Sequence, residues 1–136
     1  MTETSLVAGL VNVLRTELKG AVIFKHADRF THGIPDISIT SRHTLWWEVK
    51  YADPDFKLPG IQELTIKRLG TAAFYVIFAE RQPLVPARTT FIVSPHCIGE
   101  WWAQPTAQTP GFDLQWLAIQ AKLYLDGREC NAAHLL

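Results

Sequence analysis

The chain has 136 residues, of which 48% are hydrophobic and 19% charged, a composition that suits one domain with its own core and excludes a disordered segment. Thirteen Lys and Arg residues balance thirteen Asp and Glu residues, so bulk positive charge cannot be the main force that holds a partner. No apolar run reaches the roughly 20 residues that cross a bilayer, and we expect no membrane partner. Two cysteines and the lack of a signal-peptide pattern favour a reducing, cytoplasmic location.

The hydrophobic pattern predicts alternating helices and strands. Four segments are expected to be helical: 5–19, 61–69, about 97–103 and about 113–126. Five segments are expected to be strands: 21–27, 36–41, 44–51, 72–79 and 89–93. Glycines follow three of the helices and are expected to end them: Gly20, Gly70 and Gly127.

This element order predicts an α/β fold with a mixed central sheet and helices on both faces. We expect a single domain over residues 1–136. Its core would span residues 5–80 in the order α-β-β-β-α-β, and residues 81–136 would add a strand and helices as a C-terminal extension.

Three polar residues on neighbouring strands carry the chemistry. Asp36 lies on the polar face of its strand, and Glu48 and Lys50 share one face of the next strand, about 6.5–7 Å apart. A hairpin between these strands would bring Asp36 beside Glu48, so that both carboxylates could hold one cation. Two carboxylates with water and phosphate oxygens suit Mg²⁺ or Mn²⁺. A lysine beside such a cation neutralises charge on a phosphoryl transition state, so the set predicts phosphodiester hydrolysis.

The first predicted helix offers one more carboxylate. At about 100° per residue, Glu17 falls inside the apolar arc formed by Leu6, Leu10 and Leu14. A carboxylate on a buried face needs a partner, which a metal site or Lys50 would supply. The alternative is that Glu17 lies at the end of the helix and reaches solvent.

This arrangement resembles the PD-(D/E)XK nuclease superfamily over about residues 5–80. Within it, the chain is most similar to the VRR-NUC group and the related Holliday-junction resolvases. The motif here is Gly33-Ile34-Pro35-Asp36, followed after an interval of 11 residues by Glu48-Val49-Lys50. Three further elements follow in the order of that group: Gln62, Leu69-Gly70 and the strand Phe74-Tyr75-Val76-Ile77.

The resemblance implies a restriction-endonuclease-like core and a metal-dependent endonuclease that hydrolyses DNA phosphodiester bonds with Mg²⁺ or Mn²⁺. It implies that Asp36, Glu48 and the Val49 carbonyl bind the cation, with Glu17 as the acidic residue of the first helix. Lys50 would position or activate the water, and Gln62 would form a hydrogen bond near the site. If the enzyme resolves branched DNA, we expect a homodimer, because two strands must be cut symmetrically. A phage, mobile-element or bacterial context fits a small nuclease of this type.

Two other interpretations stay open. One is a catalytically inactive nuclease-fold module that binds nucleic acid or protein, which the zero net charge leaves open. The other is an unrelated α/β domain in which Glu48 and Lys50 form a surface pair. The intact set of Asp36, Glu48 and Lys50 favours catalysis, because a decayed site would be free to lose one of them.

The aromatic and imidazole side chains near the motif have two interpretations each. His26 and His32 could contact the site, or could form hydrogen bonds with the backbone, which is the commoner role for such histidines. Trp46 shares the strand face of Glu48 and could wall the site, but packing under the first helix is the preferred interpretation.

Overall fold

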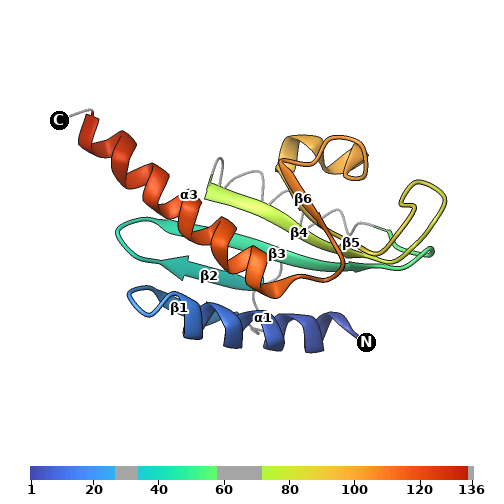
Figure 1. Cartoon of the computed structure of the whole chain (residues 1–136), viewed down its shortest axis with the longest axis horizontal. Helices are drawn as coiled ribbons and strands as arrows, with labels where there is room; N and C mark the ends of the chain where they lie inside the picture. Colours follow the sequence, from blue (N-terminus) through green and yellow to red (C-terminus); the bar gives the residue numbers. More distant parts are fainter. Residues whose placement is uncertain (27–33, 58–71, 135–136) are drawn as a thin grey trace.

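One mixed sheet of six strands organises the chain (Figure 1). The computed structural model describes residues 1–26, 34–57 and 72–134, with 128–134 in backbone only. The strands lie in chain order: β1 (Val22–Lys25), β2 (Ile37–Thr40), β3 (Thr44–Ala52), β4 (Ala73–Ala79), β5 (Thr89–Val93) and β6 (Ala107–Pro110). The pairing of β3 with β4 is parallel, and the other four pairings are antiparallel. The predicted α/β class with a mixed sheet is confirmed.

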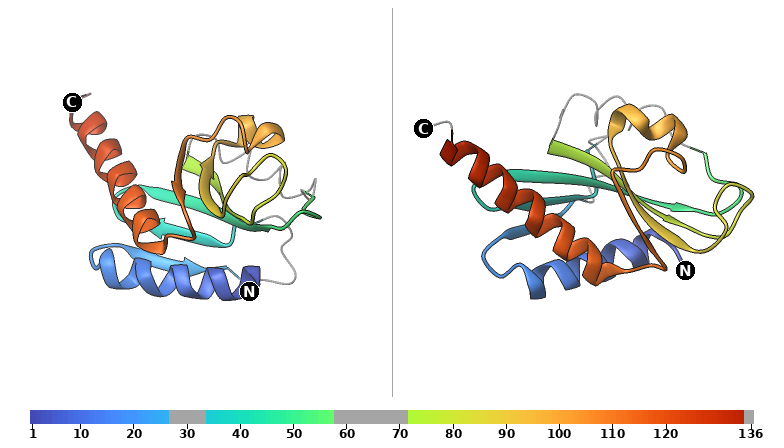
Figure 2. Two further views of the ribbon diagram at one scale, coloured as in Figure 1. Left: turned by 45° about the vertical axis from the view of Figure 1, so that its right-hand side comes forward. Right: turned by 45° about the horizontal axis from the view of Figure 1, so that its top comes forward.

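The long helices cover one face of this sheet. Both α1 (Glu3–Glu17) and α3 (Leu114–His134) pack there and contact each other, and α3 crosses the strands so that its C-terminal end projects beyond them (Figures 1 and 2). The short 3₁₀ helix η2 (Pro95–Glu100) contacts β4 from the opposite face. The predicted helix 61–69 lies outside the described residues.

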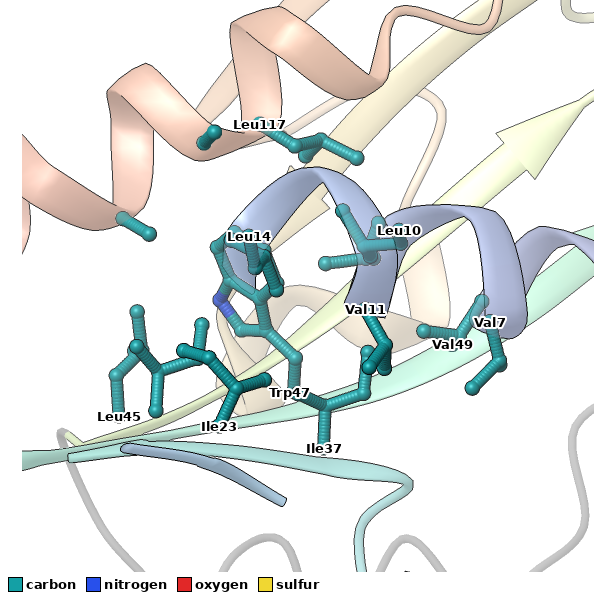
Figure 3. Packing of buried hydrophobic residues seen from close by; sticks show 14 of the residues in the cluster. Val7, Leu10, Val11, Leu14, Ile23, Ile37, Leu45, Trp47, Val49 and Leu117 are labelled. Carbon is teal, nitrogen blue, oxygen red and sulfur yellow. The ribbon is translucent and has the colours of Figure 1, made fainter. Parts of the chain in front are cut away.

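Alternation along β3 divides its side chains between two hydrophobic core clusters, one on each face of the sheet. Leu45, Trp47 and Val49 point toward the helices, where the apolar residues of α1 pack against them (Figure 3). The buried residues of α1 are those of the predicted arc: Leu6, Val7, Leu10, Val11 and Leu14. Figure 3 shows Trp47 reaching from β3 toward Leu14 of α1. The residues that alternate with them, Trp46, Glu48 and Lys50, therefore point to the opposite face.

Three boundaries differ from the sequence prediction. The cap of α1 is Thr2, whose hydroxyl accepts a hydrogen bond from the Ser5 N–H in a reciprocal capping box, so the helix begins earlier than expected. The last helix continues through Gly127 to His134, because a glycine with helical neighbours lowers helix stability without ending it. Strand β6 was not predicted, since a short edge segment ending in Pro110 carries little β signal.

No helix among the described residues is long and apolar enough to cross a membrane.

Candidate hydrolytic site

The hairpin of β2 and β3 brings the two carboxylates together, as predicted. The antiparallel register pairs Ile37 with Trp47. Asp36 precedes Ile37 by one residue and Glu48 follows Trp47 by one, so these two residues lie opposite each other where β2 begins.

Two carboxylates cap the free edge of β3 beyond this point. Strand β3 continues past the start of β2, so its next outward N–H groups have no strand partner on that side. The Val49 N–H donates to Asp36 Oδ2 at 2.8 Å, and the Tyr51 N–H donates to Glu3 Oε1 at 3.0 Å. The N–H and C=O of one strand residue point to the same edge, so the Val49 carbonyl is directed to the Asp36 side. The Val49 carbonyl therefore lies on the edge of β3 that the Asp36 and Glu3 carboxylates cap.

Glu48 and Lys50 form a buried pair beside Asp36. Their residues are 0% and 5% exposed, and Lys50 Nζ lies 3.9 Å from Glu48 Oε2. Within the described part of the chain, neither carboxylate oxygen of Glu48 has a hydrogen-bond partner. The interpretation of Glu48 and Lys50 as a surface pair is therefore wrong. Asp36 nevertheless lies close enough to change the pKa of Glu48 through its side chain and its backbone. Ionising Glu48 in this buried place beside Asp36 is costly, and a bound cation would lower that cost.

Burial controls the protonation of Glu48. Loss of solvation, together with the neighbouring Asp36 carboxylate, raises the pKa of Glu48 from 4.5 to about 9, although Lys50 opposes this shift. Glu48 therefore holds its proton at neutral pH when no cation is bound. Loading with a divalent cation would release that proton, because the carboxylate is the form that binds metal.

This shift predicts how stability depends on pH in the absence of metal. Between pH 4.5 and about 9 the unfolded chain has lost the Glu48 proton and the folded chain keeps it. Stability is therefore full at the acidic end and falls as pH rises through this window, by up to about 1.4 kcal/mol per pH unit. We expect Glu48→Gln to reduce this slope, measured by urea unfolding in EDTA at a series of pH values. The matched control is Glu100→Gln, which changes an exposed glutamate. Equal slopes for the parent and Glu48→Gln would contradict the assignment.

Two of the expected site residues are not brought to Asp36 and Glu48. Glu17 is exposed at the C-terminal end of α1, where it lines a hollow with Lys19, Lys122 and Asp126. It reaches solvent because the helix ends there, so the expected contact with the site is not formed. Gln62 lies outside the described residues, as do Gly33 and His32.

Glu3 takes the position expected of Glu17. It lies in the first turn of α1, about 21 Å along the helix axis from Glu17. With Lys25, His26 and Asp36 it lines a hollow of about 250 Å³. Glu3 was not predicted because the helix was expected to begin at residue 5, although at about 100° per residue Glu3 falls inside the same buried arc as Leu6 and Leu10. The available signal was its place in the first turn, where an acidic side chain complements the helix dipole.

His26 and Trp46 lie beside the carboxylates. His26 Nε2 is 2.8 Å from Ser38 Oγ, and the His26 N–H donates to the carbonyl of Asp36. The ring of His26 lies 5.4 Å from the ring of Trp46, on the face opposite α1. The preferred interpretation of Trp46, packing under the first helix, is wrong. Its neighbour Trp47 takes that place, as the alternation of the strand requires.

The donor set fits a hard divalent cation in part. Asp36, Glu48 and the Val49 carbonyl supply oxygen ligands of the kind that Mg²⁺ prefers, with room for water and phosphate. Among the residues that the structure describes, no three His, Cys, Asp or Glu side chains are grouped as a metal site. The protein side chains thus offer two ligands, which suits a metal that shares its coordination with substrate oxygens.

Comparison with known proteins adds no family assignment. No protein-family model matches the chain. No curated protein matches it either. The resemblance to PD-(D/E)XK nucleases stays a prediction from the sequence motif.

Proposed function

We propose that the chain is a Mg²⁺- or Mn²⁺-dependent endonuclease that hydrolyses DNA phosphodiester bonds. One observation carries the proposal: the buried Glu48 carboxyl group lies opposite Asp36 on the neighbouring strand and beside Lys50. Two neighbouring carboxyl groups of which one is buried are hard to ionise together, and a divalent cation held between them would stabilise their charged form. Asp36, Glu48 and the Val49 carbonyl would hold the cation.

The residues of the site have separate roles in this reaction. When bound, the cation supplies Lewis acidity that polarises the phosphoryl oxygen and acidifies water. The water oxygen would form a bond to phosphorus and release a proton to solvent, while the ester P–O bond breaks and the leaving oxygen takes up a proton from solvent. Lys50 supports this step with a compact positive charge at the developing phosphoryl charge. Its low exposure keeps this charge poorly screened by solvent.

A cleavage assay tests the proposal. The protein is incubated with linear duplex, single-stranded, flap and four-way-junction DNA, with Mg²⁺, with Mn²⁺ and with EDTA. We expect cutting in both metals and none in EDTA. Preference for the junction would support resolution of branched DNA by a homodimer. Metal-independent cutting, or a folded protein that neither cuts nor binds metal, would contradict the proposal.

Glu3 is expected to support hydrolysis and Glu17 is not. The Glu3 carboxylate holds the free edge of β3 next to the Val49 carbonyl, so Glu3→Gln should loosen the site. We expect hydrolysis to fall by about 10- to 100-fold, with more Mn²⁺ needed for half-maximal rate. Glu17→Gln, at the other end of the same helix, should leave both quantities unchanged. Equal losses in the two variants would reject the assignment of Glu3.

A binding module without catalysis is the second candidate function. The observation that favours it is that Asp36 and Glu3 already accept hydrogen bonds from backbone N–H groups, which is a structural use of both carboxylates. This candidate predicts DNA or protein binding that does not depend on divalent metal. Metal-dependent cutting in the assay above would reject it.

A further inference from the structure

An exposed aromatic side chain lies on the edge strand of the sheet. Strand β1 is the first strand in the sheet order, and Val22 and Phe24 on it are 53% and 57% exposed. A large aromatic side chain left in solvent on an edge strand forgoes the free energy of burial and exposes an apolar surface. The Phe24 ring is therefore available for contact with a ligand.

The register places this ring on the face of the candidate site. Phe24 pairs with Ser38, and Ser38 pairs with Trp46, so all three point to the same side of the sheet. Glu48 follows Trp46 by two residues and shares that face. The Phe24 ring lies 6.3 Å from the His26 ring, which lies 5.4 Å from the Trp46 ring. A row of three rings thus runs inward from the sheet edge, and its innermost ring, Trp46, is half-buried against the core of that face. We call Phe24, His26 and Trp46 the aromatic row.

The charge of the chain limits how it could hold nucleic acid. Its formal net charge is zero, so contacts to phosphates alone give little affinity. Stacking of a base on an aromatic side chain does not depend on net charge and tolerates any sequence. A paired base is covered on both faces by its neighbours, whereas an unpaired base has faces to offer. Lys25, the neighbour of Phe24, alternates to the α1 face and lines the hollow next to Asp36, together with Glu3 and His26.

We propose that the aromatic row stacks unpaired nucleobases next to the scissile phosphate, with Phe24 as the outermost platform. The substrate class is therefore a strand with unpaired nucleotides, as in single-stranded or branched nucleic acid. This inference rests on the proposed function, because it places the strand across the same carboxylates.

Binding to an oligonucleotide tests the row separately from hydrolysis. The probe is a fluorescein-labelled oligothymidylate of about 16 nucleotides, the upper site size of one single-strand-binding domain, followed by anisotropy. All proteins carry Asp36→Asn and are measured without metal, so that nothing is cut and one negative charge is removed. We expect Phe24→Leu to weaken binding by about 5- to 100-fold and Phe24→Tyr to retain it. Leu123→Ala, which changes a 61% exposed apolar residue of α3, is the control and should bind as the parent does.

Each outcome decides the proposal. A loss of oligothymidylate affinity confined to Phe24→Leu supports the proposal. Parallel measurements with duplex DNA show whether unpaired strands are preferred. Measurements with oligouridylate show which sugar is favoured. No binding by the parent, equal affinity of Phe24→Leu and Phe24→Tyr, or tighter binding of duplex would overturn it. A change of oligomeric state in Phe24→Leu, seen by sedimentation, would also overturn it and assign the surface to a second copy of the chain.

The two proposals can fail independently. Metal-dependent cutting with binding that ignores Phe24 would reject the aromatic row and leave the nuclease. Binding that depends on Phe24 in a protein that cuts nothing would retain the row and reject the nuclease.

Discussion

Lys50→Met is expected to lower the rate of DNA hydrolysis by at least about 10²- to 10³-fold, the cost of losing one positioned charge-stabilising group. Methionine keeps most of the lysine stem, so the buried position stays filled while the charge 3.9 Å from Glu48 is lost. The measurement is the initial rate on the preferred DNA at saturating Mg²⁺. Because Lys50 is not expected to bind the cation, the affinity for Mn²⁺ should change much less than the rate.

The control for this substitution is another lysine of the chain. Lys57 is exposed and outside the site, so Lys57→Met should cut DNA at the parental rate. Circular dichroism and the urea midpoint should show that both variants are folded. A folded Lys50→Met protein with parental activity would remove Lys50 from the mechanism.

Trp47→Ala is expected to cost about 3–5 kcal/mol of unfolding free energy, the largest stability loss from one substitution in the sheet. Its side chain is 1% exposed and lies between β3 and α1, among residues of α1 and α3 (Figure 3). A domain of this size has about 5–15 kcal/mol in total, so the variant is left marginal. Urea unfolding followed by circular dichroism measures the effect.

Two further variants, a smaller change at Trp47 and a change at an exposed residue, serve as comparisons for the stability loss of Trp47→Ala. Trp47→Phe keeps a ring in the same position and should lose part of the same free energy. Leu123→Ala removes an exposed side chain and should change stability by less than about 0.5 kcal/mol. A loss in Trp47→Ala no greater than that of Leu123→Ala would contradict the packing described for β3 and α1.

The sequence predicted the parts of this fold that local pattern determines. The apolar arc of the first helix and the alternation of Trp46, Trp47, Glu48 and Val49 showed correctly which side chains share a face, because the period of an element decides this. The period did not show which strand face α1 covers, nor that Glu48 is buried. The hairpin that sets Asp36 beside Glu48 was predicted from the short connection between two strand patterns.

The features that the sequence could not predict depend on where helices and strands end and on which other elements they contact. Glu17 matched the angular position of a buried residue, but it is the last residue of α1 and reaches solvent. Glu3 comes close to the site because β3 continues past β2 and leaves an N–H group to cap, which is a tertiary feature. Strand β6 forms because β5 offers it an edge, with little propensity of its own.

Binding of Mn²⁺ measured by calorimetry tests the central claim most directly, since it depends on no choice of DNA. The parent should bind the ion saturably, and Asp36→Asn and Glu48→Gln should each bind it more than about 10-fold more weakly, the low end of what even outer-shell substitutions cost. Glu17→Gln should bind as the parent does. An affinity unchanged by Asp36→Asn would show that these carboxylates hold no catalytic cation.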